Sequence, residues 1–154
     1  MRKMEELIDD FKKGIRTEEG ILKLNSISKG RFLEEINAVL FVGNKNLLTA
    51  KIFKGRGLYY KPWVELFSIE RDFFNSSFEL SLYKTIYKHL PKGGRLFVEY
   101  WKDKETLLFL SKGGEPEDSR LGKLLKIAGF TSLRDWYIPE GLKEGYYKLQ
   151  GEKL

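Results

Sequence analysis

Cysteine is absent from this sequence of 154 residues, and histidine occurs once, at His89. The absence of thiols excludes disulfide bonds, thiolate metal sites and cysteine nucleophiles. A single imidazole argues against a histidine-based metal site and against a Ser-His-Asp triad, so we expect no metal cofactor. Candidate chemistry must therefore be sought elsewhere, chiefly among carboxylates and tyrosines.

Long apolar runs and glutamine are also scarce. No stretch approaches the roughly 18 apolar residues of a membrane helix, and residues 1–11 mix lysine, glutamate and aspartate without the apolar segment of a signal peptide. We therefore expect a cytoplasmic protein that does not enter a membrane. Gln150 is the only glutamine while 32% of the residues are charged, a balance that resembles proteins from thermophiles.

What the chain does contain is enough apolar material for one core. Its length, with 42% hydrophobic and 14% aromatic residues, predicts a single domain over residues 1–154. The formal net charge of +6 attracts anions, which suits nucleic acid, CoA or another phosphate-bearing partner. A lysine-rich solvated surface explains the same excess without any ligand.

The segment from Ser76 to Trp101 gives the clearest secondary-structure signals in the chain. Ser76 and Glu79 have the spacing of a capping box, and apolar residues then recur every four positions up to Leu90. Pro91 ends this helix, two glycines let the backbone reverse, and residues 96–101 are strongly β-prone. The segment predicts a helix followed by a buried strand.

The residues before this helix predict an antiparallel meander. Residues 38–42 and 47–53 form a hairpin around a four-residue turn, and residues 63–69 form a third strand. Further upstream, residues 21–24 suit an edge strand and residues 26–30 a loop. Residues 4–13 have the apolar spacing of a short helix.

The residues after it predict two more helices and a closing hairpin. Asp103 can start a short helix, although a strand is the alternative, and residues 121–128 form a clearer helix that ends at Gly129. Residues 131–138 and 146–149 form the hairpin. We predict an α/β (α+β) fold with a mixed, mainly antiparallel sheet and helices on both faces, the Ser76 helix on one and the Leu121 helix on the other.

This order of elements resembles the GNAT superfamily of acyl-CoA N-acyltransferases over most of the chain. In that family, backbone amides at the start of the central helix hold the CoA pyrophosphate, usually through a glycine-containing loop after an Arg or Gln. The matching segment here begins at Arg71 and reaches Ser76 and Ser77, with Phe73 and Phe74 in place of glycines. The resemblance implies an acyl-CoA cofactor, an amine substrate of small-molecule or protein type, and Arg71, Ser76 and Ser77 as cofactor-binding residues.

Two other resemblances cover less. The last third, with residues 90–96 and 127–130, is similar to S-adenosylmethionine-dependent methyltransferases, but the first 75 residues lack that family's glycine-rich cofactor loop. Residues 136–141 resemble an uncharacterised archaeal domain family of about this length, which has no assigned activity.

Carboxylates and one tyrosine are the candidate catalytic groups. Glu65 and Glu99 lie on or beside central strands, where a desolvated carboxylate can act as a base toward an amine, and Tyr137 can supply a general acid. Glu140 and Glu144, beside glycines in the closing loop, can hold a cationic acceptor. Outward-facing carboxylates and cross-strand packing explain the same residues without catalysis.

Residues 51–63 form a second candidate site. They place lysines and an arginine, among them Lys54 and Arg56, between aromatic residues and contain no acid. Cations bind phosphates and exposed rings stack on bases, so this segment suits the phosphates of a cofactor or, in a non-catalytic protein, nucleic acid or a nucleotide. Solvated lysines and rings that belong to the core are the alternative.

Overall fold

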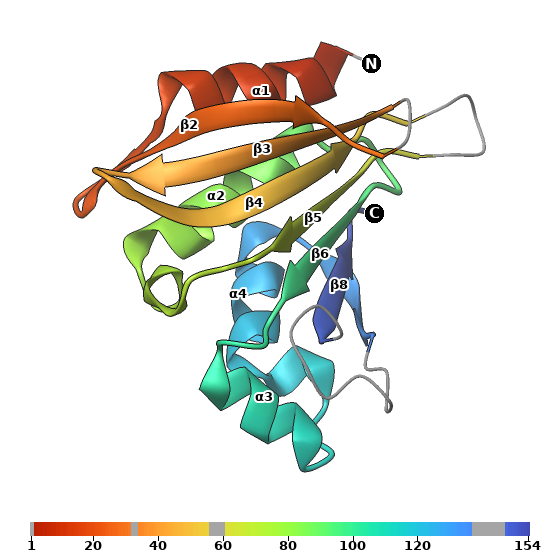
Figure 1. Ribbon diagram of the computed structural model, residues 1–154. Helices are drawn as coiled ribbons and strands as arrows, with labels where there is room; N and C mark the ends of the chain where they lie inside the picture. Colours follow the sequence, from red (N-terminus) through yellow and green to blue (C-terminus); the bar gives the residue numbers. More distant parts are fainter. Residues whose placement is uncertain (1, 32–33, 56–60, 137–146) are drawn as a thin grey trace.

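The computed structural model describes residues 2–31, 34–55, 61–136 and 147–154. These residues form one sheet of eight strands in the order β1-β2-β3-β4-β5-β6-β8-β7. Every neighbouring pair is antiparallel except β5 and β6, which run parallel (Figure 1). The predicted α+β class with a mixed, mainly antiparallel sheet is confirmed. The strands are β1 Ile15–Thr17, β2 Gly20–Lys29, β3 Glu35–Val42, β4 Lys45–Phe53, β5 Trp63–Phe67, β6 Arg95–Glu99, β7 Thr131–Asp135 and β8 Lys148–Glu152.

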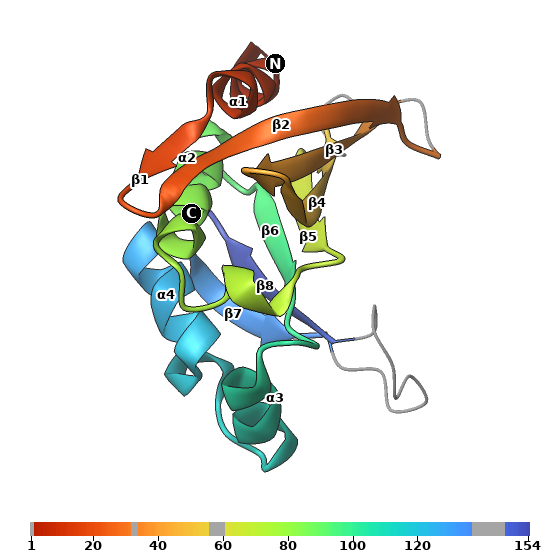
Figure 2. The ribbon, with the colours of Figure 1, turned by 60° about the vertical axis from the view of Figure 1, so that its left-hand side comes forward.

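Helices α1, α2 and α4 lie on the same side of this sheet, and α3 lies beyond the end of β6 (Figure 2). We expected the Leu121 helix on the face opposite the Ser76 helix. It packs beside that helix instead, because Phe130 at its end meets the ring of Tyr87 with centroids 5.1 Å apart. Within the described residues, no helix combines the length and the apolar character needed to cross a membrane. The helices are α1 Arg2–Lys13, α2 Ser77–His89, α3 Lys104–Ser111 and α4 Arg120–Ala128.

The predicted hairpin is confirmed as β3 and β4, with a tighter turn than expected at Gly43 and Asn44. The loop predicted for residues 26–30 is wrong, because β2 continues to Lys29 and pairs with β3 along that length. The side chains there are mostly exposed, so their polarity resembles a loop while the backbone is held by its neighbour. The strand predicted at residues 21–24 lies within β2, but β1 and β7, not β2, are the outermost strands of the sheet.

The start of α2 is where expected, but its capping contacts differ. Ser76 occupies the N-cap position without capping an amide through its side chain, and its hydroxyl donates to the Phe73 carbonyl at 2.6 Å. Glu79 accepts from the backbone N–H of Asn75 at 2.8 Å rather than from that of Ser76. The predicted capping box is therefore wrong, because Glu79 turns toward α4, where it meets Arg120.

The single histidine joins two helices. His89, 5% exposed at the end of α2, places Nε2 2.7 Å from the Asp10 carboxylate of α1. This contact between His89 and Asp10 links α2 to α1 on the helix side of the sheet.

Candidate functional site

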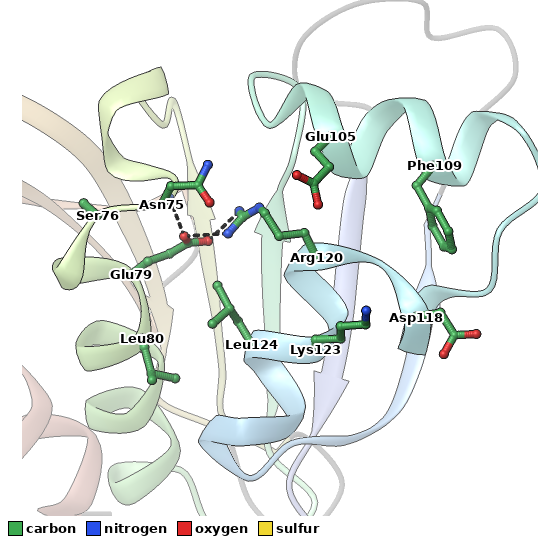
Figure 3. A pocket seen from close by; sticks show the side chains of 10 residues that line it. All are labelled: Asn75, Ser76, Glu79, Leu80, Glu105, Phe109, Asp118, Arg120, Lys123 and Leu124. Carbon is green, nitrogen blue, oxygen red and sulfur yellow. Dashed lines mark hydrogen bonds and ion pairs between the residues drawn. The ribbon is translucent and has the colours of Figure 1, made fainter.

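The parallel strands β5 and β6 lead to the starts of α2 and α3, which help to line a cavity. Their backbones pair as far as Leu66 and Val98 and then part, β5 toward the start of α2 and β6 toward α3. A cavity of about 690 Å³ lies beyond them, between the starts of α2 and α4 and one side of α3. We call it the β5–β6 pocket. Figure 3 shows its lining, which includes Asn75, Ser76, Glu105, Phe109, Lys123 and Leu124.

Three helices begin at this pocket, and a carboxylate or hydroxyl of the protein lies at or just before each start. Glu79 accepts from the Asn75 amide, Asp103 accepts from the Thr106 amide at 3.3 Å, and Ser119 accepts from the Gly122 amide at 2.9 Å. Helix starts attract negative charge because of their unpaired N–H groups and the helix dipole. Here two carboxylates and a hydroxyl of the protein already supply much of the negative charge that these helix starts attract.

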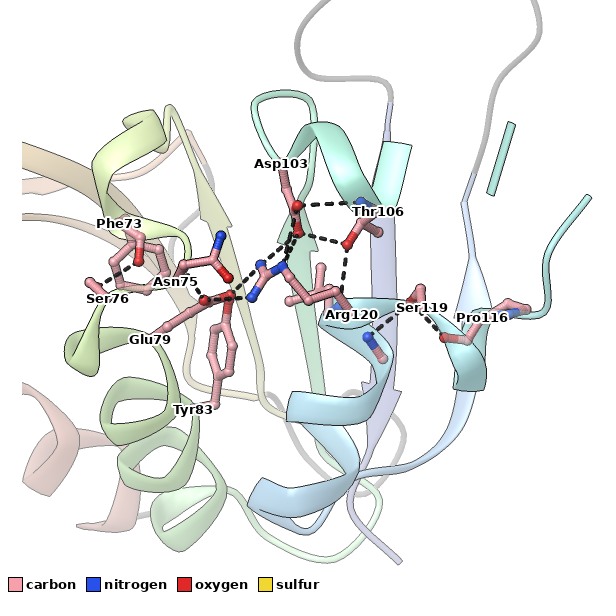
Figure 4. A network of polar contacts seen from close by, with 12 residues as sticks. Phe73, Asn75, Ser76, Glu79, Tyr83, Asp103, Thr106, Pro116, Ser119 and Arg120 are labelled. Carbon is pink, nitrogen blue, oxygen red and sulfur yellow. Dashed lines mark hydrogen bonds and ion pairs between the residues drawn. The ribbon is translucent and has the colours of Figure 1, made fainter. Parts of the chain in front are cut away.

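Arg120 joins those two carboxylates at the inner wall of the pocket (Figure 4). Its two terminal nitrogens each lie 2.9 Å from one oxygen of Glu79, a bidentate pair. Nη2 also lies 2.6 Å from Asp103 Oδ2. The side chains are 12%, 1% and 2% exposed for Arg120, Glu79 and Asp103, so one cation neutralises two buried anions.

Neighbouring hydroxyls complete this network. Tyr83 donates to Glu79 at 2.9 Å, and Thr106 donates to Asp103 at 2.6 Å. Burial raises the pKa of the Tyr83 hydroxyl well above its ordinary value, and the Glu79 charge adds to the rise. Burial alone would lower the pKa of Arg120, but hydrogen bonds and charges from Glu79 and Asp103 outweigh it and raise that pKa. The guanidinium of Arg120 therefore stays charged and hydrogen-bonded to both carboxylates.

Sequence reasoning missed Arg120 and Asp103 as a pair. The only signal was that each lies at the start of a predicted helix, Asp103 as the N-cap of α3 and Arg120 as the first residue of α4. Nothing in the spacing of residues 79, 103 and 120 indicates that the starts of three helices meet. The convergence follows from the sheet order, which places β5 next to β6.

The residues predicted to hold a cofactor are only partly brought together. Ser76 lines the pocket, whereas Arg71 is exposed in the short 3₁₀ turn Arg71–Phe73 and does not line it. The Ser77 amide donates to the Glu19 carboxylate, and its hydroxyl donates to Thr17 at 2.7 Å. The hydrogen bonds from Ser77 lower the pKa of Glu19 below its ordinary value.

The two predicted bases lie on the opposite, helix-free side of the same strands. Glu65 on β5 and Glu99 on β6 share a face because Glu65 is in register with Phe97, two residues before Glu99. Lys148 of β8 is in register with Glu99, and its ammonium lies 3.0 Å from the Glu65 carboxylate. The Glu65 side chain is 17% exposed, while Glu99 is 4% exposed. Glu65 is thus the more accessible of the two.

Phe53 and Trp63, the described aromatic residues of segment 51–63, belong to this helix-free face. Phe53 stacks on Trp63 with centroids 5.5 Å apart, Trp63 meets Phe97 at 6.2 Å, and Phe97 meets Trp136 at 6.3 Å. We call these rings the aromatic row. Lys54 follows the end of β4 and is partly exposed. Phe53 and Trp63 are partly exposed too, so the interpretation of these rings as core does not hold for them.

Several predicted site residues lie outside the described residues: Tyr137, Arg56, Glu140 and Glu144. In the described part of the chain, no group of three or more histidine, aspartate or glutamate side chains is arranged to hold a metal ion.

Comparisons with known proteins place the chain among uncharacterised relatives. A family model described as "Protein of unknown function (DUF1122)" matches residues 18–154. The chain is 48% identical to a protein of unknown function from Aquifex aeolicus, whose crystal structure it matches with a TM-score of 0.89 over 99% of this chain and 78% of that one. A search of curated proteins found no match. The expected likeness to an uncharacterised family is supported, but its archaeal character is not, since this relative is bacterial.

Proposed function

Because the chain belongs to the DUF1122 family of proteins of unknown function, we propose its function from the geometry of the pocket: transfer of an acyl group from acyl-CoA to an amine. The observation that carries this proposal is the parallel pair β5 and β6, joined through α2, whose carboxyl ends lead to the helices that line the cavity. In open sheets with parallel strands, ligands bind beyond the carboxyl ends. The strand order around this pair also resembles that of the GNAT superfamily, in which acyl-CoA lies at the start of the central helix.

The pocket has a suitable size and a mixed lining. Its volume of about 690 Å³ falls within the range of roughly 300–1,000 Å³ found for small-molecule sites. Leu80, Leu124 and Phe109 offer apolar contact to a pantetheine chain, while Lys123 offers a cation to a phosphate. Arg71, Ser76 and Ser77 remain the proposed contacts to the cofactor at the start of α2.

Glu105 of α3, an exposed carboxylate that lines the β5–β6 pocket, is the proposed base, because Glu65 and Glu99 lie on the opposite side of the sheet. The amine nitrogen attacks the thioester carbonyl carbon, a C–N bond forms, the C–S bond breaks, and CoA leaves as the thiol. The proton lost by the amine passes to the Glu105 carboxylate. Tyr137 remains the predicted acid for the departing thiolate, and Glu140 and Glu144 remain predicted contacts to the acceptor.

An assay of thiol release tests this function. Purified protein is incubated with acetyl-CoA and a panel of primary amines, and free CoA thiol is measured over time. We expect release that depends on both the protein and an amine. An absence of release with every amine, together with no detectable acetyl-CoA binding, would overturn the proposal.

Glu19 gives a prediction specific to this site. Its carboxylate holds the Ser77 amide, which a CoA phosphate would otherwise accept. We expect Glu19→Ala to tighten acetyl-CoA binding by about two- to fivefold, the scale of an exposed charged contact, because a competing anion is removed. Calorimetric titration measures the change, and Glu18→Ala, an exposed neighbour, serves as the control. Weaker binding to Glu19→Ala than to Glu18→Ala would contradict the placement of the phosphates.

A second candidate function is the binding of single-stranded nucleic acid, favoured by the aromatic row. Rings in a row can stack on successive bases, and cations beside them can hold phosphates. Lys61 and Arg95 line a cavity of about 420 Å³ beside Phe53 and Trp63, although Glu152 lines it too. This site lies at the amino ends of β5 and β6, away from the β5–β6 pocket.

The aromatic row predicts a salt-dependent affinity. We expect a fluorescent single-stranded oligonucleotide to bind more weakly as salt rises, and Trp63→Leu to lose about 1–3 kcal/mol of binding free energy because one base loses its stacking partner. Fluorescence anisotropy measures both, with Lys126→Gln, which removes an exposed cation of α4 away from the aromatic row, as a control. Unchanged oligonucleotide affinity in Trp63→Leu would remove this candidate and leave acyl transfer untouched.

A further inference from the structure

A separate cavity of about 430 Å³ lies on the other side of α3 from the β5–β6 pocket. Glu105 and Phe109 of α3 line the β5–β6 pocket, whereas Leu107 and Leu110 line this one. Its other walls are the end of β6, the end of β7 and the start of β8, which contribute Tyr100, Trp101, Asp135 and Tyr147. We call it the α3 cavity. Its lining is mainly aromatic and aliphatic, with one carboxylate.

That carboxylate is unusual in its surroundings. Asp135 is in register with Leu149, so it occupies a position on the core side of the sheet. The Tyr100 hydroxyl donates to its Oδ1 at 2.6 Å. Across the described residues, no lysine, arginine or histidine forms an ion pair with it. A half-buried carboxylate without a cation is costly, because burial removes water from the charge and nothing replaces it.

The shift in acidity agrees with this geometry. Burial raises the pKa of the Asp135 carboxyl above its ordinary value, and the hydrogen bond from Tyr100 offsets only part of the rise. A positive charge placed beside the carboxylate would favour its ionised form and remove the cost.

The aromatic walls suit the same kind of charge. Trp101 and Tyr147 stack with centroids 5.2 Å apart, and Tyr147 meets Tyr100 at 5.9 Å. Faces of tryptophan and tyrosine attract cations through their quadrupole. Leu107 and Leu110 add an apolar wall on the α3 side, which suits a hydrocarbon or ring attached to the cation.

We infer that the α3 cavity binds a primary amine that carries an apolar or aromatic group. The ammonium pairs with Asp135, and the apolar part lies against Trp101 and the leucines of α3. Because α3 is the wall that this cavity shares with the β5–β6 pocket, the amine lies close to the proposed acyl-CoA site. Its role as the acyl acceptor rests on the proposed function, whereas its binding does not.

The test uses 2-phenylethylamine and its neutral analogue 2-phenylethanol, each titrated calorimetrically into the full chain without acetyl-CoA. We expect saturable binding of the amine and at least about tenfold weaker binding of the alcohol, since a charged hydrogen bond is worth about 1.5–3 kcal/mol. Asp135→Asn should weaken the binding of the amine by a similar factor and leave the binding of the alcohol unchanged. Asp9→Asn, an exposed residue of α1, should change neither.

Trp101→Leu provides an independent variant if Asp135→Asn fails to fold, and it should weaken the binding of the amine several-fold. Equal affinity of the two ligands for the wild-type chain, or unchanged amine affinity in the folded variants, would overturn the inference. Amine binding without thiol release would instead count against acyl transfer alone, and thiol release with other amines but no binding of 2-phenylethylamine would count against the α3 cavity alone.

Discussion

Arg120→Met is expected to destabilise the protein by about 3–5 kcal/mol, the cost of leaving buried carboxylates without their cation. The side chain bridges Glu79 and Asp103, which are 1% and 2% exposed, so water cannot replace the guanidinium without opening the junction of α2, α3 and α4. Methionine keeps much of the length of the side chain and stays compatible with a helix. Urea unfolding followed by circular dichroism measures the loss.

Two further variants show that charge is the cause. Lys123→Met removes an exposed cation from the same helix and should change the stability by less than about 0.5 kcal/mol. Adding Glu79→Gln and Asp103→Asn to Arg120→Met should recover part of the lost stability, because no uncompensated charge remains. A small loss in Arg120→Met, similar to that in Lys123→Met, would show that the network is not needed for folding.

Glu105→Gln is expected to lower the rate of acyl transfer by about 10²–10⁴-fold while acetyl-CoA still binds with its original affinity. Glutamine keeps the shape of this side chain, which lines the β5–β6 pocket. It cannot take a proton from the amine at neutral pH. The change should therefore appear in kcat and not in the affinity for acetyl-CoA.

Glu152→Gln is the matched control for this prediction, since Glu152 lies on β8, on the helix-free face of the sheet and away from the pocket. We expect it to leave the rate within about twofold of the original, as for a surface substitution remote from the chemistry. Equal rates for Glu105→Gln and the wild-type chain would remove Glu105 as the base, even if transfer itself is observed.

The sequence was most informative where local patterns decide the structure. The apolar spacing from Phe78 to Leu90, followed by Pro91, predicted α2 because such a stripe can only be buried against a sheet. The β-prone runs of β3 and β4 were equally clear. The prediction of a loop at residues 26–29 was wrong because these residues form a strand through backbone pairing with β3, which their exposed side chains do not reveal.

The candidate sites were harder to predict because they depend on contacts between distant residues. Ser76 and Glu79 fit a capping box locally, but Glu79 gains more from a bidentate pair with Arg120, forty-one residues away. Asp135 carried no local signal at all, because its burial depends on β8 and its partner hydroxyl on Tyr100 of another segment. Glu65 was visible as an acid within an otherwise apolar strand, but the face of the sheet on which it lies depends on the register of β5 with β6.

Calorimetric titration with acetyl-CoA tests the central claim most directly, because it asks whether the β5–β6 pocket is a thioester site. Leu80 lines this pocket, and Leu80→Trp would fill part of it, whereas Ile127→Trp adds the same bulk at a residue of α4 that is 62% exposed. We predict saturable binding to the wild-type chain and to Ile127→Trp, and none to Leu80→Trp. Absence of saturable binding to the wild-type chain, or equal binding to all three proteins, would contradict the account.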